Sequence, residues 1–116
     1  MKKTNKPIAG YHLLMLLSAV DYKFHIEEEK VIREYLEEEF PFPMNFDAEM
    51  DIIANLAPSE WKKHFEFQAQ CFYDDSFEDE REQFKTFAKK LIKANQVVSP
   101  VEHEYYMLMK KTWKMA

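Results

Sequence analysis

The sequence is poor in glycine and cysteine, and each shortage excludes a class of protein. A single glycine among 116 residues excludes glycine-rich phosphate cradles and dinucleotide fingerprints, which need several glycines in a fixed order. A single cysteine, Cys71, excludes an internal disulfide and a zinc site built from paired cysteines. The apolar helical setting of Cys71 predicts a small core residue instead. Few glycines and few β-branched runs also favour helices over strands.

Long hydrophobic runs are missing as well, so no segment is expected to cross a membrane. Residues 1–20 superficially resemble a secretory signal, because lysines precede an apolar stretch. Gly10-Tyr11-His12 interrupts that stretch, and Ser18-Ala19-Val20 is a poor cleavage site. We therefore favour a cytoplasmic protein over a secreted one.

Acidic and basic residues are unevenly distributed along the chain. Residues 27–82 hold eighteen acidic and five basic residues, whereas residues 85–116 hold seven lysines and two glutamates. The acidic middle disfavours non-specific binding to nucleic acid. Because the length suits one core, we expect residues 1–116 to form a single domain, with residues 1–7 as a flexible N-terminal segment.

Hydrophobic periodicity predicts an all-α bundle of about six helices. The expected ranges are about 8–20, 26–40, 47–57, 59–75, 77–94 and 99–113. The first range is apolar nearly all round, so its helix should be central. Asp47 and Ser59 are the predicted N-caps of the third and fourth helices, and Ser99-Pro100-Val101-Glu102 predicts a capping box at the sixth. Phe77 opens the apolar stripe predicted for the fifth.

One motif occurs twice, 74 positions apart, from Asp21 to Glu28 and again from Asn95 to Glu102. Each copy follows an apolar helical stretch and opens another helix. A duplicated helix–turn–helix in a short chain predicts two similar hairpins, packed about a pseudo-twofold axis.

The second copy, with the residue before it, reads Ala94-Asn95-Gln96-Val97-Val98-Ser99-Pro100-Val101-Glu102. It resembles the Ala-Asp-Gly-x-hydrophobic-Ser-x-x-Glu pattern of the TerB-like tellurite-resistance family, and the first copy resembles it through Asp21, Phe24 and Glu28. The chain departs from that pattern at Tyr22, His25, Asn95 and Gln96. Over about residues 10–113, the resemblance implies a bacterial, mostly cytoplasmic all-α domain linked to tellurite resistance or stress response. It implies action through acidic surface residues and protein partners, with no shared catalytic mechanism.

Four residues of the duplicated motif are candidate ligands for a divalent cation, because hard cations bind several converging oxygens. They are Asp21, Glu28, Asn95 and Glu102. Alternatively, Asp21 accepts hydrogen bonds from loop amides and Glu28 completes a helix cap. We favour capping, because it explains the spacing without a metal, and we expect no other cofactor.

The remaining polar residues do not indicate catalysis. His12 and His64 stand apart in sequence and lack metal-ligand spacing, so we expect isolated, exposed histidines, as for His25 and His103 beside their glutamates. His64 and Cys71 share a helix face but lie about 10 Å apart along its axis, too far for a catalytic pair. We expect no enzymatic activity.

The leading hypothesis is therefore a module that binds a protein partner. The candidate contact residues on the acidic second helix are Glu27, Glu34 and Glu38. Residues 40–50, rich in Phe and Met, form either a lid over the core or an exposed interface; burial is the commoner fate of Phe. The partner and the oligomeric state stay open.

Overall fold

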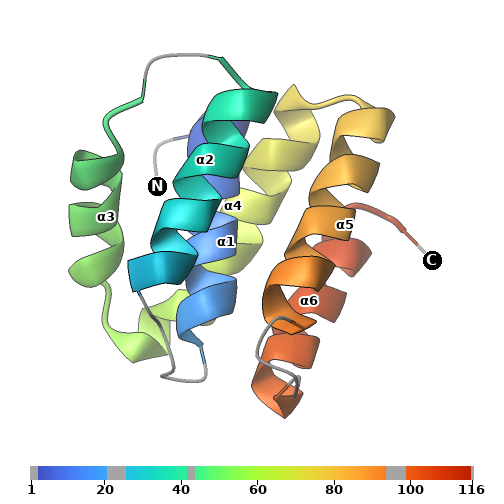
Figure 1. The fold of residues 1–116 in the computed structure, drawn as a ribbon. Coiled ribbons are helices and arrows are strands. Elements are labelled where there is room, and N and C mark those ends of the chain that lie inside the picture. The colour runs from blue at the N-terminus through green and yellow to red at the C-terminus, as the bar shows by residue number, and fades with distance from the viewer. Residues whose placement is uncertain (1–2, 21–25, 42–43, 94–98, 116) are drawn as a thin grey trace.

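The computed structural model of the chain is an all-α bundle, as predicted (Figure 1). The structure describes residues 3–20, 26–41, 44–93 and 99–115. These ranges hold six α-helices and one short 3₁₀ turn, and they contain no strand. The helices are α1 (Lys6–Ala19), α2 (Ile26–Glu39), α3 (Phe46–Ala54), α4 (Trp61–Asp75), α5 (Glu78–Lys93) and α6 (Pro100–Thr112), and the 3₁₀ turn is η1 (Pro58–Glu60).

Helix α1 is the centre of the bundle, which confirms the expectation from its apolar sequence. It contacts each of the other α-helices, with α3 on one side and α5 and α6 on the other (Figure 1). Tyr11, Leu13 and Leu14 are among its fully buried side chains. A helix that is apolar on every face needs cover on every face, and this arrangement provides it.

Aromatic rings join the C-terminal helices to the core. The Phe72 ring lies 4.6 Å from that of Phe84 and 5.0 Å from that of Trp113, measured between centroids. The indole Nε1 of Trp113 donates a hydrogen bond to the carbonyl oxygen of Ala69, at 2.8 Å. Cys71 is buried among the core residues, as its apolar context predicts.

Two helix starts differ from the predicted ones. Asn45, not Asp47, caps α3, because its Oδ1 accepts a hydrogen bond from the Ala48 amide at 3.1 Å. The Asp47 carboxylate instead accepts from Arg33 Nη2 at 2.8 Å. The N-cap residue of α4 is Glu60, not the predicted Ser59, and its side chain caps no amide of α4. The Glu60 carboxylate instead accepts from the Ala57 amide at the start of η1, at 2.8 Å.

The predicted stripe of the fifth helix is wrong at its first residue. Phe77 precedes α5 and is 73% exposed, while its amide donates to Glu80 Oε1 at 2.8 Å. By contrast, the described Phe and Met residues of the 40–50 segment pack inward, as in a lid, while residues 42–43 lie outside the described part. Phe40 and Phe46 are buried, and Met44 and Met50 pack against the core.

Several N-terminal residues make side-chain contacts with the bundle. The flexible segment 1–7 expected from the sequence stays a prediction, and residues 1–2 lie outside the described residues. The Thr4 hydroxyl donates to Gln68 Oε1 at 2.6 Å, and Asn5 Oδ1 caps α1 by accepting from the Ile8 amide at 3.1 Å. Lys6 forms an ion pair with Glu80 at 2.8 Å. Among the described residues, no helix has the length and apolar character needed to cross a membrane.

Candidate functional site

The duplicated turns lie largely outside the described residues. Asp21 and Asn95 both fall there, so no geometry connects them to a ligand. Glu28 is half-buried in the first turn of α2. Glu102 is buried at the start of α6, where its Oε1 accepts from the Ser99 amide at 3.0 Å while Ser99 Oγ accepts from the Glu102 amide at 3.1 Å. The predicted capping box is therefore confirmed.

A divalent-cation site at these turns stays a prediction. In the part of the chain that the structure describes, no group of three or more His, Cys, Asp or Glu side chains is arranged to hold a metal ion. The oxygen of Glu102 that faces Ser99 already accepts an amide hydrogen. This geometry is that of a helix cap.

The glutamates of the acidic helix α2 differ in exposure: some face solvent, and Glu29 is buried. Glu34 and Glu38, two of the predicted contact residues, are exposed one turn apart, and the side chain of Glu27 lies outside the described residues. Within the described ranges, neither Glu34 nor Glu38 has an ion-pair partner. Glu29 is buried instead and accepts from the Tyr11 hydroxyl at 3.1 Å and from Arg33.

Val31 belongs to the same outer surface of α2. Val31 is apolar but 45% exposed, whereas Ile32 and Leu36 of the same helix are buried. The exposed residues of α2 are Lys30, Val31, Glu34, Glu37, Glu38 and Glu39. We call this set the α2 surface.

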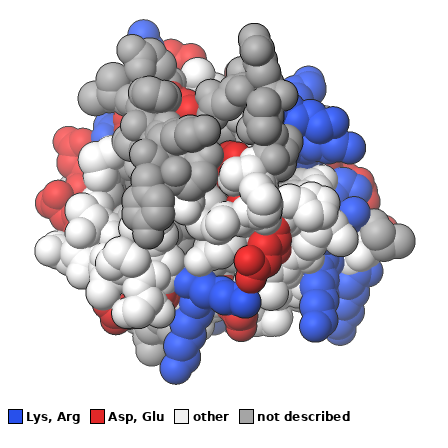
Figure 2. All heavy atoms as spheres, turned by 90° about the horizontal axis from the view of Figure 1, so that it is seen from below, with Lys and Arg blue, Asp and Glu red and all other residues white. Residues whose placement is uncertain are grey.

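Basic side chains gather on a different side of the molecule. Figure 2 shows lysine and arginine atoms concentrated on the side where α5 and α6 lie. The exposed lysines of these two helices are Lys89, Lys90, Lys93 and Lys111. The same two helices also expose Glu78, Asp79, Glu82 and Glu104, so their surface carries both signs of charge.

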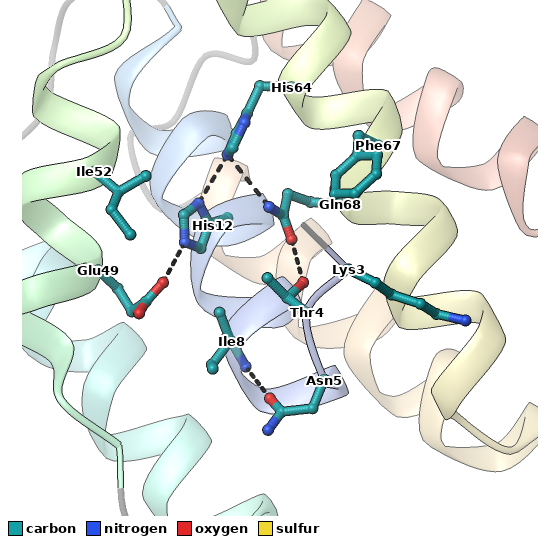
Figure 3. A pocket seen from close by; sticks show the side chains of 10 residues that line it. All are labelled: Lys3, Thr4, Asn5, Ile8, His12, Glu49, Ile52, His64, Phe67 and Gln68. Carbon is teal, nitrogen blue, oxygen red and sulfur yellow. Dashed lines mark hydrogen bonds and ion pairs between the residues drawn. The ribbon is translucent and has the colours of Figure 1, made fainter. Parts of the chain in front are cut away.

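Two histidines predicted to be isolated and exposed are in fact buried and in contact. His12 on α1 is 1% exposed and His64 on α4 is 7% exposed. His12 Nδ1 lies 2.9 Å from His64 Nε2, and His12 Nε2 lies 2.8 Å from Glu49 Oε1 on α3. The chain of contacts continues from His64 to Gln68 and then to Thr4 (Figure 3). The prediction failed because α1 and α4 bring together residues 52 positions apart.

Burial favours the neutral form of both histidines. Burial lowers the pKa of His12 from its ordinary value, and the Glu49 carboxylate opposes part of that shift. Burial, reinforced by the neighbouring His12, lowers the pKa of His64 to about 4, although Glu60 acts in the opposite direction. A neutral pair of this kind holds the helices together without a buried net charge on either ring.

The hydrogen-bond partners assign the ring protons. The Glu49 carboxylate can only accept, so His12 Nε2 carries a hydrogen. In neutral His12 the other nitrogen, Nδ1, is then an acceptor, and His64 Nε2 donates to it. Gln68 completes the network with its side-chain amide, which lies 3.4 Å from His64 Nε2 and also bonds to the Thr4 hydroxyl.

An open pocket of about 690 Å³ lies against this network. It is lined by Lys3, Thr4, Asn5, Ile8, His12, Glu49, Ile52, His64, Phe67 and Gln68. We call it the histidine pocket. Among its lining residues Thr4 carries the sole hydroxyl, which donates to Gln68, and the sole cysteine of the chain is not among them. The arrangement can bind and orient a molecule, but it contains no nucleophile paired with a base.

One sequence signal pointed to this site. His12 stands inside a stretch that is apolar on all sides, a setting that indicates a buried ring in need of a polar partner and that the prediction of an exposed histidine overlooked. Which residue would be that partner depends on how α4 packs on α1. Comparison with known proteins adds no relative from which a role could be transferred: no protein-family model, curated protein or solved structure matches this chain.

Proposed function

We propose that this protein is a non-enzymatic, TerB-like helical domain that acts by binding a protein partner through the α2 surface. The observation that carries the proposal is the exposed carboxylate pair Glu34 and Glu38, which has no ion-pair partner among the described residues. Carboxylates one turn apart on a helix repel each other and lower its stability by roughly 0.2–0.5 kcal/mol. A partner with basic side chains would remove that repulsion.

The exposed Val31 also supports an interface on this helix. It provides an apolar contact beside the carboxylates, and interfaces combine an apolar centre with a polar rim. Carboxylates at such a rim steer an oppositely charged partner and select against acidic ones. We therefore expect a partner with a basic surface.

The family part of the proposal rests on the resemblance of the duplicated motif. It is supported by the six-helix order and by the capping box between Ser99 and Glu102. A bacterial cytoplasmic setting and a link to tellurite or stress responses belong to the same proposal. A fold-level resemblance transfers architecture better than activity, so the binding surface has to be tested directly.

The test is charge reversal on the α2 surface with a matched control. The variant Glu34→Lys/Glu38→Lys is compared with Glu78→Lys/Asp79→Lys, which reverses two exposed charges in the first turn of α5. We expect a partner isolated with the unaltered protein to bind the α5 variant normally and to lose at least tenfold in affinity for the α2 variant, as measured with both components purified.

Salt provides a second measurement of the same interaction. Affinity for the partner should fall as ionic strength rises, because exposed charge pairs are screened. Equal losses in both variants would indicate a general charge effect, and an unaffected α2 variant would place the interface elsewhere. Either result would refute the proposal, provided that circular dichroism shows the variants to be folded.

A further inference from the structure

A groove of about 420 Å³ runs between α2 and α5. The two helices lie side by side and run in opposite directions (Figure 1). The rings of Tyr35 and Phe87 stack across the groove with centroids 3.9 Å apart, and both residues are half-buried. Val31 is 45% exposed and lies one turn before Tyr35 on α2, where it extends this apolar strip. We call the groove and its apolar strip the α2/α5 face.

Charge is divided between the two ends of the α2/α5 face. Because the helices are antiparallel, the C-terminal end of α2 lies beside the N-terminal half of α5. Glu38 and Glu39 line the groove at this end, and Lys90 lines it at the other. Lys30, which is exposed about two turns before Glu38 on α2, lies at the same end as Lys90. The face therefore has an acidic end and a basic end, with the two rings between them.

The charges at the two ends are not paired with each other within one chain. In the described ranges, Glu38, Glu39, Lys30 and Lys90 take part in no ion pair. Along α2, Glu38 and Lys30 lie about 12 Å apart, wider than the i,i+4 spacing at which helix ion pairs form. A second molecule with the matching charges can therefore pair with both ends at once.

A face of this kind is complementary to itself. In a two-fold dimer both copies use the same patch, so the patch has to match its own copy. With the axis in the interface and perpendicular to the helices, the acidic end of each copy meets the basic end of the other. With the axis parallel to the helices, like ends meet and repel each other. The charge pattern therefore selects the first arrangement.

We propose that the α2/α5 face is the contact surface of a homodimer. The apolar strips of the two copies form the centre of the interface, and the charged ends form its rim, the arrangement that protein interfaces commonly show. The apolar centre provides affinity, while the charged rim fixes the orientation. This inference rests on the proposed function, because it names a second copy of this chain as the partner of the α2 surface, with its lysines as the basic side.

The first measurement is the oligomeric state of the whole chain by sedimentation velocity. The chain has a mass of 14.0 kDa, and we expect a species of twice that mass to form as the concentration rises from micromolar to millimolar. A chain that stays monomeric at millimolar concentration would overturn the homodimer.

Charge reversal at each end then tests how the two copies are arranged. Glu38→Lys/Glu39→Lys makes both ends of the face basic, and Lys30→Glu/Lys90→Glu makes both ends acidic. Each variant alone should dimerise at least tenfold more weakly, because like charges then meet across the interface. An equimolar mixture of the two should form dimers again, since the basic ends of one variant meet the acidic ends of the other. No recovery in the mixture of folded variants would contradict the arrangement.

A remote variant controls for the change in net charge. Glu66→Lys/Glu104→Lys alters the net charge as much as the reversal of the acidic end, at exposed positions on α4 and α6 that do not line the groove. It should dimerise like the unaltered chain, and an equal loss in this control would refute the proposed interface. Circular dichroism establishes that each variant is folded.

The homodimer and the proposed function fail in different ways. A monomeric chain overturns the homodimer alone, because another protein with a basic surface can still bind the α2 surface in its own charge-reversal test. A chain that dimerises equally well with Glu34→Lys/Glu38→Lys has its interface elsewhere. That result also overturns the homodimer on the α2/α5 face, and it leaves the α2 surface to be tested with other partners.

Discussion

Phe84 packs so closely on Gly10 that a Cβ atom at position 10 would lie 3.0 Å from Cε2 of the Phe84 ring. The same atom would lie 3.3 Å from Leu36 Cδ2 and 3.5 Å from Phe72 Cε2. The single glycine of the chain therefore marks a place where α1 lies tightly against the rings of α4 and α5. Its role is close packing within a helix and not a turn.

Substitution of Gly10 by alanine tests this contact. Alanine gains about 1 kcal/mol of helix propensity over glycine, but inserting a methyl group into a packed core costs about 1–3 kcal/mol. We expect Gly10→Ala to lower the free energy of unfolding by about 1 kcal/mol in urea titrations. Phe84→Leu should cost less in the Gly10→Ala background than alone, because the smaller side chain makes room. Additive effects of the two substitutions would contradict the contact.

The buried histidines make folding stability depend on pH. Both have lowered pKa values in the folded state, so the unfolded chain binds more protons and the free energy of unfolding decreases as the pH is lowered. The contribution of His64 is fully present above its unfolded pKa of 6.5 and declines as the pH falls toward its folded pKa of about 4. From that shift, we expect the free energy of unfolding to be about 2 kcal/mol lower at pH 5 than at pH 8.

Two histidine variants distinguish this source from other titrating groups. His64→Gln should flatten the decline between pH 8 and pH 5, whatever its effect on stability at pH 8. His103→Gln, at an exposed position, should leave the decline as it is. Urea titrations at several pH values measure both, and an equal decline in His64→Gln and in the unaltered protein would show that the buried pair is not its cause.

The capping box should make a measurable contribution to α6. Ser99→Ala removes the hydroxyl that accepts from the Glu102 amide, and loss of such a cap costs about 1 kcal/mol. Thr112→Ala is the control, because its hydroxyl donates to the Leu108 carbonyl within the helix, a bond that adds little to helix stability. Chemical denaturation measures the free energy of unfolding of both variants. An equal loss in Ser99→Ala and Thr112→Ala would show that the capping box adds no stability of its own.

Phe77 and Phe84 should respond very differently to truncation. Phe77 is 73% exposed, so Phe77→Ser should change the free energy of unfolding by less than about 0.5 kcal/mol. Phe84 is fully buried, and Phe84→Ala should cost about 3–5 kcal/mol. Thermal and urea unfolding of the two variants checks this contrast, and a large loss for Phe77→Ser would place that ring in the core.

Helix positions could be predicted because each helix buries a continuous stripe of apolar residues against the core. In α4, Phe65, Ala69 and Phe72 recur at spacings of four and three and are all fully buried. Helix starts were harder to predict, because Asn45 and Asp47 are both good capping types two positions apart. In the structure, Asp47 pairs with Arg33 of α2, and Asn45 caps α3. A tertiary contact, which the local sequence does not show, therefore decides between the two.

Prediction of the candidate sites was limited in the same way, because local contacts could be predicted and tertiary contacts could not. The capping box between Ser99 and Glu102 is local, so its spacing predicted it. The contact of His12 with His64 joins α1 to α4 across 52 positions, and no local pattern encodes which helices become neighbours. The exposed pair Glu34 and Glu38 was predictable from helical period alone, because both lie opposite the apolar stripe of α2.

The central position of α1 also has a consequence during synthesis. Helices α4, α5 and α6, which all pack against α1, are translated after it. Until they leave the ribosome, the fully buried Leu13, Leu16 and Leu17 of α1 have no lasting cover. Nascent chains with exposed apolar surface are substrates for chaperones and prone to aggregation. Ribosome-bound chains halted before α4 should therefore associate with chaperones, and release should follow once α6 has emerged.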